Sequence, residues 1–301
     1  MCDEAIQVDV ITTNRLALGT AQFGMPYGIV NRTGQPDRHT VTALLERART
    51  AGMDTLDTAI DYGDSEAILG KAGIDNWKII TKLPAIPDDV ADVADWIGHA
   101  VAQSMQRLRI DSLHGLLLHR PAQLHEPRGY KIHSALEQLK QRGFVQAIGI
   151  SIYEPRELDE LNGQFNFDLV QAPLNVFNQE LLQSGWLERL NQAGTDIHVR
   201  SVFLQGLLLQ SADTLPERFK SWQLLWQQWY AWLDQTGLTP LQACLRFVLS
   251  FDEIDRVIIG IDSPQQLEEI LAAADGDLPD LPADLCCHDP DLINPARWQA
   301  T

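Results

Sequence analysis

The sequence predicts a single closed barrel of eight parallel strands and eight helices, a (β/α)8 or TIM barrel, and three observations support this. Short runs rich in Ile, Leu and Val alternate along the chain with longer amphipathic segments, which is the pattern of a parallel sheet covered by helices. Eight segments of each kind occur. Such a barrel needs roughly 250 residues, so the 301 residues of this chain leave room for the barrel and a short additional segment.

The expected strands are apolar runs bounded by turn residues, as strands buried on both faces should be. In chain order they cover 16–19, 55–58, 78–82, 115–119, 147–152, 169–172, 197–202 and 257–261. The expected helices carry apolar residues at helical spacing. They cover 40–51, 65–71, 90–108, 131–142, 155–161, 180–192, 238–249 and 264–274. Ser263 followed by Pro264 indicates a helix start, and Gly143 indicates a helix end.

The alternation of strands and helices lies within residues 1–275, which we expect to form the barrel domain. Residues 276–301 are acidic and contain several prolines, and we expect a C-terminal tail that packs on or near the barrel. Tryptophans recur at helical spacing from Trp222 to Trp232. They predict a helix whose aromatic face packs on the barrel or on another subunit, with a lid or sugar-stacking role as the alternative.

Composition and charge exclude several kinds of function. The net charge of −18 repels phosphate backbones and anionic membranes, so we expect no nucleic-acid partner and no membrane partner. The N-terminal residues lack a basic region, and no apolar run reaches about 18 residues, so we expect a cytoplasmic protein. The four cysteines show no zinc-ligand spacing. We expect the adjacent Cys286 and Cys287 to be free thiols, and the sequence predicts no particular oligomeric state.

Polar residues end several of the expected strands. In a barrel of this kind, active sites form where the strands end at the C-terminal face. Lys82, His119, Ser151 and Gln171 end the third to the sixth strand. The other candidates are Asp57, which ends the second strand, Tyr62, which follows it, and Arg200 and Ser201 of the seventh strand. We expect all of these side chains to meet at one rim.

These residue types favour acid–base chemistry on a carbonyl group. Lys82 and Asp57 should pair, because either alone would carry a large desolvation cost. A tyrosine beside the ammonium should have its pKa lowered from ~10 toward neutrality, which would make Tyr62 a general acid. His119 can polarise the same carbonyl oxygen by a hydrogen bond. No metal is required. A purely structural ion pair is the alternative for Asp57 and Lys82.

Seven segments follow one another along residues 15 to 274. They are LALGTAQFG at 16–24, DTAIDYGDSEAILG at 57–70, TK at 81–82, LLLHRP at 116–121, GIS at 149–151, VQAPLN at 170–175 and LQGLLL at 204–209. In this order they resemble the aldo-keto reductase superfamily, and within it a bacterial subgroup of undefined substrate. The resemblance implies hydride transfer between NAD(P)(H) and a small-molecule aldehyde, ketone or sugar.

The resemblance also implies roles for individual residues. It places the catalytic tetrad on Asp57, Tyr62, Lys82 and His119. It places the cofactor contacts on Gly19, Thr20, Ser151, Gln171, Arg200, Ser201, Leu204, Gly206, Gly260, Asp262 and Gln266. The sequence departs from the family at Ile152, where the family has Asn. It departs again at Arg200, where the family often has an aromatic ring against the nicotinamide, although a planar guanidinium can also stack.

The segment after the eighth strand bears on the choice of cofactor. Family members that prefer NADP(H) place Lys or Arg there to meet the 2′-phosphate. Residues 257–271 contain neither, and Asp262 is acidic. A carboxylate suits two ribose hydroxyls better than a phosphate. The resemblance implies NADP(H), whereas these residues favour NAD(H) or weak discrimination.

Two other functions stay open at this point. A barrel aldolase would form a Schiff base at Lys82, which needs a neutral lysine and is opposed by a partner at Asp57; borohydride trapping would detect it. A cofactor-binding regulatory subunit would keep the fold and the tetrad but turn over negligibly, and steady-state reduction of an aldehyde would distinguish it.

Overall fold

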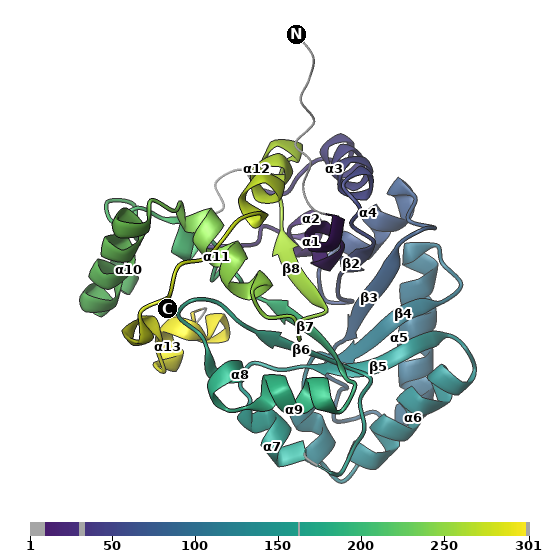
Figure 1. Cartoon of the computed structure of the whole chain (residues 1–301). Helices are drawn as coiled ribbons and strands as arrows, with labels where there is room; N and C mark the ends of the chain where they lie inside the picture. The colour runs from purple at the N-terminus through teal and green to yellow at the C-terminus, as the bar shows by residue number, and fades with distance from the viewer. Residues whose placement is uncertain (1–9, 30–33, 162, 299–301) are drawn as a thin grey trace.

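The computed structural model describes residues 10–29, 34–161 and 163–298 and shows a closed barrel of eight parallel strands (Figure 1). The strands are β1 (Leu16–Gly19), β2 (Thr55–Asp57), β3 (Lys78–Leu83), β4 (Leu113–Leu118), β5 (Val145–Ser151), β6 (Leu169–Pro173), β7 (Asp196–Arg200) and β8 (Arg256–Gly260). They pair in chain order. The ring closes where β8 pairs with β1, from Leu16 opposite Val257 to Gly19 opposite Gly260. The predicted fold class is confirmed.

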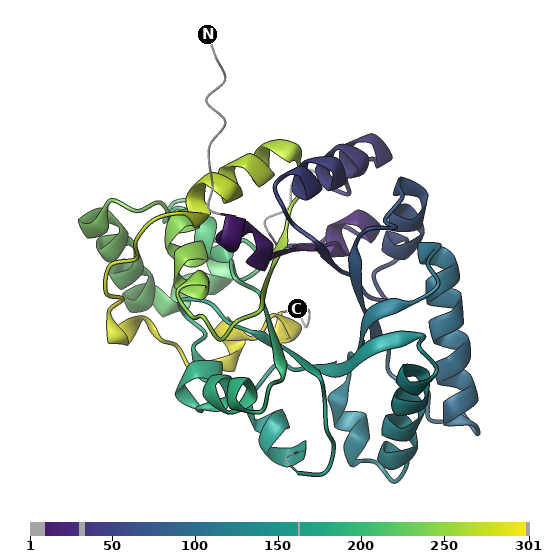
Figure 2. The same ribbon diagram turned by 45° about the vertical axis from the view of Figure 1, so that its right-hand side comes forward.

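Helices form an outer ring around the strands (Figure 2). They are α3 (Arg38–Thr50), α4 (Ser65–Ala72), α5 (Val93–Leu108), α6 (Gly129–Gln141), α7 (Arg156–Leu161), α8 (Glu180–Gln183), α9 (Trp186–Gln192), α11 (Pro240–Leu249) and α12 (Pro264–Ala274). Short helices α1 (Val10–Arg15) and α2 (Ala21–Gly24) flank β1. The predicted helix start at Ser263 is confirmed, because its side chain accepts a hydrogen bond from the Gln266 amide.

One predicted helix is divided into two. The segment 180–192 forms α8 and α9, and the break lies at Gly185, whose φ of 73° is a left-handed conformation that glycine adopts without steric cost. Such a conformation cannot continue a right-handed helix. The prediction of one continuous helix over 180–192 was therefore wrong, although α8 and α9 are both helical.

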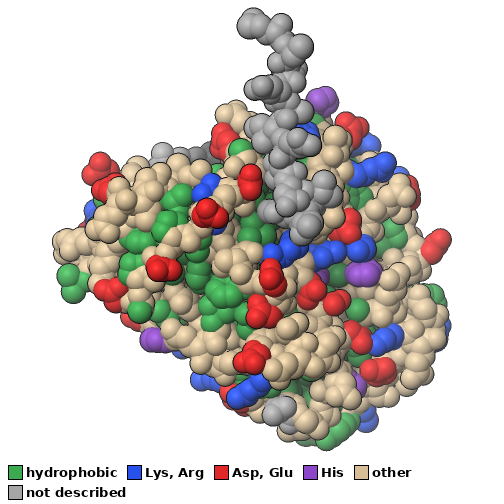
Figure 3. Space-filling view, viewed as in Figure 1, with side chains coloured by type: hydrophobic (Ala, Val, Ile, Leu, Met, Phe, Trp, Pro, Cys, Tyr) green, Lys and Arg blue, Asp and Glu red, His purple; other side chains and the backbone are tan. Residues whose placement is uncertain are grey.

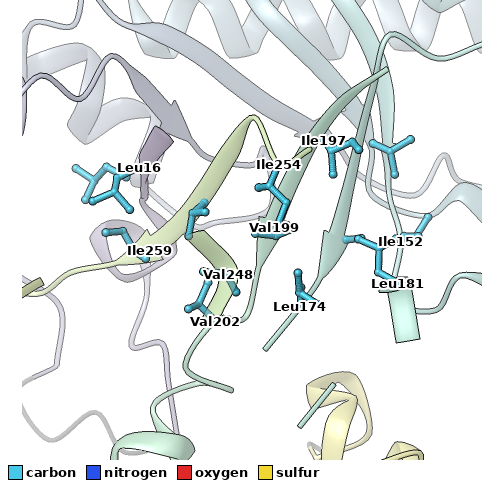
Figure 4. Packing of buried hydrophobic residues seen from close by; sticks show 14 of the residues in the cluster. Leu16, Ile152, Leu174, Leu181, Ile197, Val199, Val202, Val248, Ile254 and Ile259 are labelled. Carbon is cyan, nitrogen blue, oxygen red and sulfur yellow. The ribbon is translucent and has the colours of Figure 1, made fainter. Parts of the chain in front are cut away.

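The apolar core has two parts. The larger lies between the sheet and the helices and includes Val199 of β7 and Val248 of α11 (Figure 4). The smaller consists of Ile80, Leu117 and Leu169 on β3, β4 and β6. Side chains alternate between the two faces of a strand, so the next side chain of β3 on the same face is that of Lys82. The small cluster therefore lies on the same face of the sheet as Lys82, below the polar residues of the C-terminal mouth.

Helix α10 (Gln223–Thr236) lies outside the ring, beside α11 and the C-terminal segments (Figure 1). Its tryptophans pack within the chain: Trp229 is fully buried, and the Trp226 ring lies 4.9 Å from that of Phe177. The indole of Trp232 donates to the Asp280 carbonyl oxygen at 3.0 Å. The C-terminal segments η4 (Ala283–Leu285), α13 (Pro290–Ile293) and η5 (Pro295–Arg297) follow on this side, and the Trp298 ring lies 4.8 Å from that of Phe219.

The remaining short elements belong to the loops. They are η1 (Pro121–His125), η2 (Leu207–Leu209) and η3 (Glu217–Trp222). None of the helices in the described part of the chain combines the length and apolar character needed to cross a membrane. Acidic side chains are spread among neutral and basic ones on the face shown in Figure 3.

Candidate active site

Four side chains expected to act together meet at the C-terminal mouth of the barrel. Asp57 ends β2 and Lys82 lies near the end of β3. His119 directly follows β4, and Tyr62 lies in the turn after β2. The Lys82 ammonium lies 5.1 Å from the centre of the Tyr62 ring, and the rings of Tyr62 and His119 meet edge to face with centroids 6.0 Å apart. The fold thus gathers residues that are up to 62 positions apart in the sequence.

The expected ion pair between Asp57 and Lys82 is present and buried. Lys82 Nζ donates to Asp57 Oδ1 at 2.6 Å and to the Thr58 carbonyl oxygen at 2.8 Å. The second carboxylate oxygen accepts a hydrogen bond from Gln171 Nε2 at 2.7 Å, and Ser151 Oγ donates to Gln171 Oε1 at 3.1 Å. Burial lowers the pKa of Lys82, and the Asp57 carboxylate opposes this. Both charges are therefore satisfied by several partners, as a buried pair requires.

The pKa of the Tyr62 hydroxyl is shifted in the opposite direction to the one expected from the sequence. Burial raises its pKa above the ordinary value of 10.0, and the Asp57 carboxylate raises it further, while Arg200 acts in the opposite direction. The prediction of a lowered pKa was wrong for this state of the protein. Because the Lys82 charge is neutralised by Asp57, the pair presents little net positive charge to the phenol. Tyr62 therefore holds its proton at neutral pH.

His119 is a neutral imidazole at neutral pH. Burial lowers its pKa to about 3, and the charges of Lys82, Arg200 and Arg120 act in the same direction. A neutral imidazole can donate one hydrogen bond and accept another. It can therefore polarise a carbonyl oxygen by donating a hydrogen bond, without transferring its proton.

A cavity of about 490 Å³ opens beside these residues. It extends from Asp57 at the end of β2 and Tyr62 in the following turn, past the ends of β1 and β7, to Asp262 and Gln266 after β8. Most of the expected cofactor contacts line it: Gly19, Thr20, Arg200, Ser201, Gly206, Gly260, Asp262 and Gln266. Its volume is in the range of small-molecule sites, roughly 300–1,000 Å³.

Three expected cofactor contacts lie away from the cavity wall. Ser151 and Gln171 are buried and hydrogen-bonded toward Asp57, as described above. Leu204 is fully buried in the apolar core. Conversely, Gln22 and Glu269 line the cavity but were not predicted. Glu269 lies three residues after Gln266 on α12, so helical spacing places both on one face and could have identified it.

The loop after β7 is strained where it borders the cavity. Ser201, Leu204 and Gln205 have positive φ angles of 61°, 49° and 53°, and Gly206 has 87°. Positive φ costs a residue other than glycine on the order of 1–3 kcal/mol and is concentrated at ligand sites. Turns of this kind can present backbone N–H groups to anions. A strained loop beside a cavity of this volume fits a phosphate-bearing ligand such as a nicotinamide dinucleotide.

Neighbouring groups of the chain hold the Arg200 side chain in place. Its guanidinium lies over the Tyr153 ring, 4.5 Å from the centroid. It donates to the Ile152 carbonyl oxygen at 2.9 Å and to Ser201 Oγ at 3.2 Å. Arg200 lines the cavity together with Asp57 and Tyr62. Among the described residues that line this cavity, it is the one Lys or Arg.

A (β/α)8 barrel with acid–base groups and a cavity at its C-terminal mouth is the architecture of barrel enzymes that act on small molecules. A model of the Aldo/keto reductase family matches residues 15–283. The chain belongs to this family. Members interconvert carbonyl and alcohol groups and use NAD(P)H, so the chain is classed as an oxidoreductase.

Individual relatives are similar at moderate identity. NADH-specific methylglyoxal reductase of Escherichia coli (strain K12) is 24% identical over 311 aligned residues, which cover 91% of this chain and 94% of the relative. 6-Dehydroglucose reductase of Novosphingobium aromaticivorans is 32% identical over 170 residues, covering 50% and 55%. The holo form of an aldo-keto reductase from Bacillus halodurans matches the fold with a TM-score of 0.70 at 20% identity, covering 90% of this chain and 89% of that chain.

Proposed function

We propose that this protein reduces a small aldehyde or ketone reversibly at the mouth of the barrel, with Tyr62 as the proton donor and NAD(H) as the preferred cofactor. The observation that carries the proposal is the convergence of four side chains at the barrel mouth: Lys82 contacts Asp57 and Tyr62, and His119 contacts Tyr62. Asp57 and Tyr62 line the cavity directly. Family membership supports the reaction class.

Each of the four residues has a distinct task in this proposal. Tyr62 holds a proton at neutral pH and gives it to the carbonyl oxygen as that oxygen gains charge. Lys82 stabilises the phenolate as it forms, a stabilisation needed only in the transition state. Asp57 holds Lys82 in place, and the neutral His119 hydrogen-bonds the same carbonyl oxygen. The nicotinamide, when bound, supplies or accepts the hydride at the carbonyl carbon.

We assign the cofactor to the cavity residues at and just after the C-terminal ends of β1, β7 and β8. Gly19, Thr20, Arg200, Ser201, Gly206, Gly260, Asp262 and Gln266 border the space directly. In this proposal Gln171 acts through its hydrogen bond to Asp57, and Ser151 acts through its hydrogen bond to Gln171. Leu204 anchors the strained loop in the core. Lys82 donates to two oxygen acceptors, an arrangement that opposes Schiff-base formation.

The far part of the cavity favours NAD(H). Asp262 and Glu269 line it, and both side chains carry carboxyl groups. A carboxylate repels a 2′-phosphate but can accept hydrogen bonds from ribose hydroxyls. A relative that aligns over most of the chain is named as NADH-specific. Relatives named for methylglyoxal and for a dehydroglucose support a small oxo compound as substrate.

The proposal is tested by steady-state reduction of methylglyoxal and of a panel of aldehydes and sugars with NADH and with NADPH. We expect turnover with at least one small aldehyde, and a kcat/KM for NADH that equals or exceeds that for NADPH. A charge-assisted pair with phosphate contributes roughly 1.5–3 kcal/mol, so its absence removes tenfold or more of NADPH affinity.

The substitution Gln266→Arg provides the matched comparison. It places a cation in the first turn of α12 and should tighten NADPH binding about tenfold while leaving NADH binding nearly unchanged. A wild-type protein that binds NADPH a hundredfold tighter than NADH would overturn the cofactor assignment. Tight cofactor binding with no turnover of any panel compound would instead support a cofactor-binding regulatory subunit.

A further inference from the structure

Arg200 places a positive charge at the catalytic end of the cavity, and its partners are all neutral. It donates to a backbone carbonyl oxygen and a serine hydroxyl and lies over the Tyr153 ring. Within the described part of the chain, it forms no ion pair with a carboxylate. Arg200 is only half-buried, and it borders the same space as Asp57 and Tyr62.

The other charges at this end cancel. Lys82 and Asp57 neutralise each other at 2.6 Å. Asp61 acts on Tyr62, and Arg120 acts on His119 and on Asp61, so these two opposite charges also offset each other. His119, with a pKa of about 3, and Tyr62, whose pKa is raised, are both neutral at neutral pH. The catalytic end of the cavity therefore carries one net positive charge in a chain of net charge −18. The Arg200 charge lowers the pKa of Tyr62, of Lys82 and of His119, so its field extends over the catalytic groups.

The next step rests on the proposed function. Reduction of a carbonyl group takes one hydride from the reduced nicotinamide onto carbon and one proton from Tyr62 onto oxygen. A C–H and an O–H bond form in the product, while a C–H bond of the dihydronicotinamide and the O–H bond of Tyr62 break. The nicotinamide ring ends one unit more positive than it began. Because the carbonyl carbon and oxygen are directly bonded, this change of charge must occur within a few ångströms of Tyr62.

We propose that Arg200 makes this protein bind the reduced dinucleotide more tightly than the oxidised one. The reduced nicotinamide ring is uncharged and is not repelled by the Arg200 guanidinium. The oxidised ring carries a positive charge and is repelled. Two unit charges several ångströms apart, at an effective dielectric constant of about 20, interact strongly enough to change an affinity about tenfold. The same repulsion speeds release of the oxidised cofactor after a carbonyl has been reduced. Arg200 thus sets the redox state of the nucleotide that the cavity selects.

The test compares dissociation constants of NADH and NAD⁺, measured by calorimetric titration at one salt concentration. We expect the wild type to bind NADH at least fivefold more tightly. Arg200→Gln should lower the ratio of the NAD⁺ dissociation constant to the NADH dissociation constant about tenfold, chiefly by strengthening NAD⁺ binding. Arg200→Lys keeps the positive charge and should retain most of the wild-type preference for NADH. Arg142→Gln is the matched control, because Arg142 also lies over an aromatic ring, 4.7 Å from the Phe144 centroid, but does not line the cavity. It should leave the ratio unchanged.

The ratio separates charge from structure, because a partly unfolded variant binds both forms less without changing their relative affinity. Wild-type protein that binds NAD⁺ as tightly as NADH overturns the proposal, whatever the variants do. Equal weakening of both forms by Arg200→Gln also overturns it, because that pattern indicates a contact with the phosphates, whose charge does not change. Binding of neither form by the wild type would contradict the proposed function itself.

Discussion

Replacing Tyr62 with Phe should reduce the rate of carbonyl reduction by about 10²–10⁴-fold, the usual contribution of a positioned general acid. The substitution removes the hydroxyl and keeps the ring, so the edge-to-face contact with His119 can persist. NADH binding should change little, because a single hydroxyl at one end of a long cavity adds little to the affinity for a dinucleotide. The measurements are kcat/KM for methylglyoxal and the dissociation constant of NADH.

A second tyrosine provides the control. Tyr130 on α6 is 69% exposed and packs against Phe165 at 5.1 Å, and it does not line the cavity. Tyr130→Phe should therefore leave both constants at the wild-type values. Retention of more than half of the wild-type rate by Tyr62→Phe would rule out Tyr62 as the proton donor.

Replacing Lys82 with Met should abolish turnover and also destabilise the fold. Without the ammonium, the buried Asp57 carboxylate retains the hydrogen bond from Gln171 but loses its cation. Removing one partner of a buried ion pair typically costs about 3–5 kcal/mol of unfolding free energy. The phenolate that forms during proton transfer would lose its nearby cation, so we expect a loss of at least about 100-fold in kcat. Chemical denaturation and steady-state kinetics measure the two effects separately.

The double substitution of Asp57→Asn with Lys82→Met separates catalysis from folding. It removes both charges, so most of the lost stability should return, because no unpaired charge remains buried. Activity should stay absent, because nothing stabilises the phenolate. If the double variant regained activity together with stability, Lys82 would have a structural role only.

The fold could be predicted from the sequence because its signals are local and repeated. The apolar run at 78–82 predicts a buried strand, and the helical spacing of apolar residues in 264–274 predicts a helix with one buried face. Each prediction depends only on the residues of that segment. Gly185 was the signal that 180–192 is not one helix, but glycine also occurs inside helices, as Gly70 does in α4. Whether a glycine breaks a helix depends on the tertiary contacts around it.

The candidate site was predictable in its residues but not in its electrostatics. Strand ends place Asp57, Lys82 and His119 at one rim whatever the details. The direction of the Tyr62 pKa shift depends on how deeply the hydroxyl is buried and on the net charge of its neighbours. The neighbouring pair is almost neutral, so desolvation dominates. The hydrogen bond from Gln171 to Asp57 likewise joins β6 to β2 across the barrel, and no single segment of the sequence encodes that distance.

The pH dependence of the two reaction directions tests the central claim, that Tyr62 carries the proton. Its pKa is raised, so below that pKa the phenol is protonated and ready to act as an acid, while the phenolate needed as a base is scarce. His119, with a pKa of about 3, stays neutral and adds no ionisation in this range. The guanidinium of an arginine such as Arg200 stays charged throughout this range.

We therefore expect kcat/KM for carbonyl reduction at saturating NADH to stay level from about pH 6 to about pH 9. Over the same range, kcat/KM for oxidation of the matching alcohol at saturating NAD⁺ should rise nearly tenfold for each pH unit, because the fraction of phenolate does so below its pKa. Reduction that falls with a midpoint near pH 7, or oxidation that does not depend on pH, would contradict a Tyr62 that holds its proton until the carbonyl oxygen takes it.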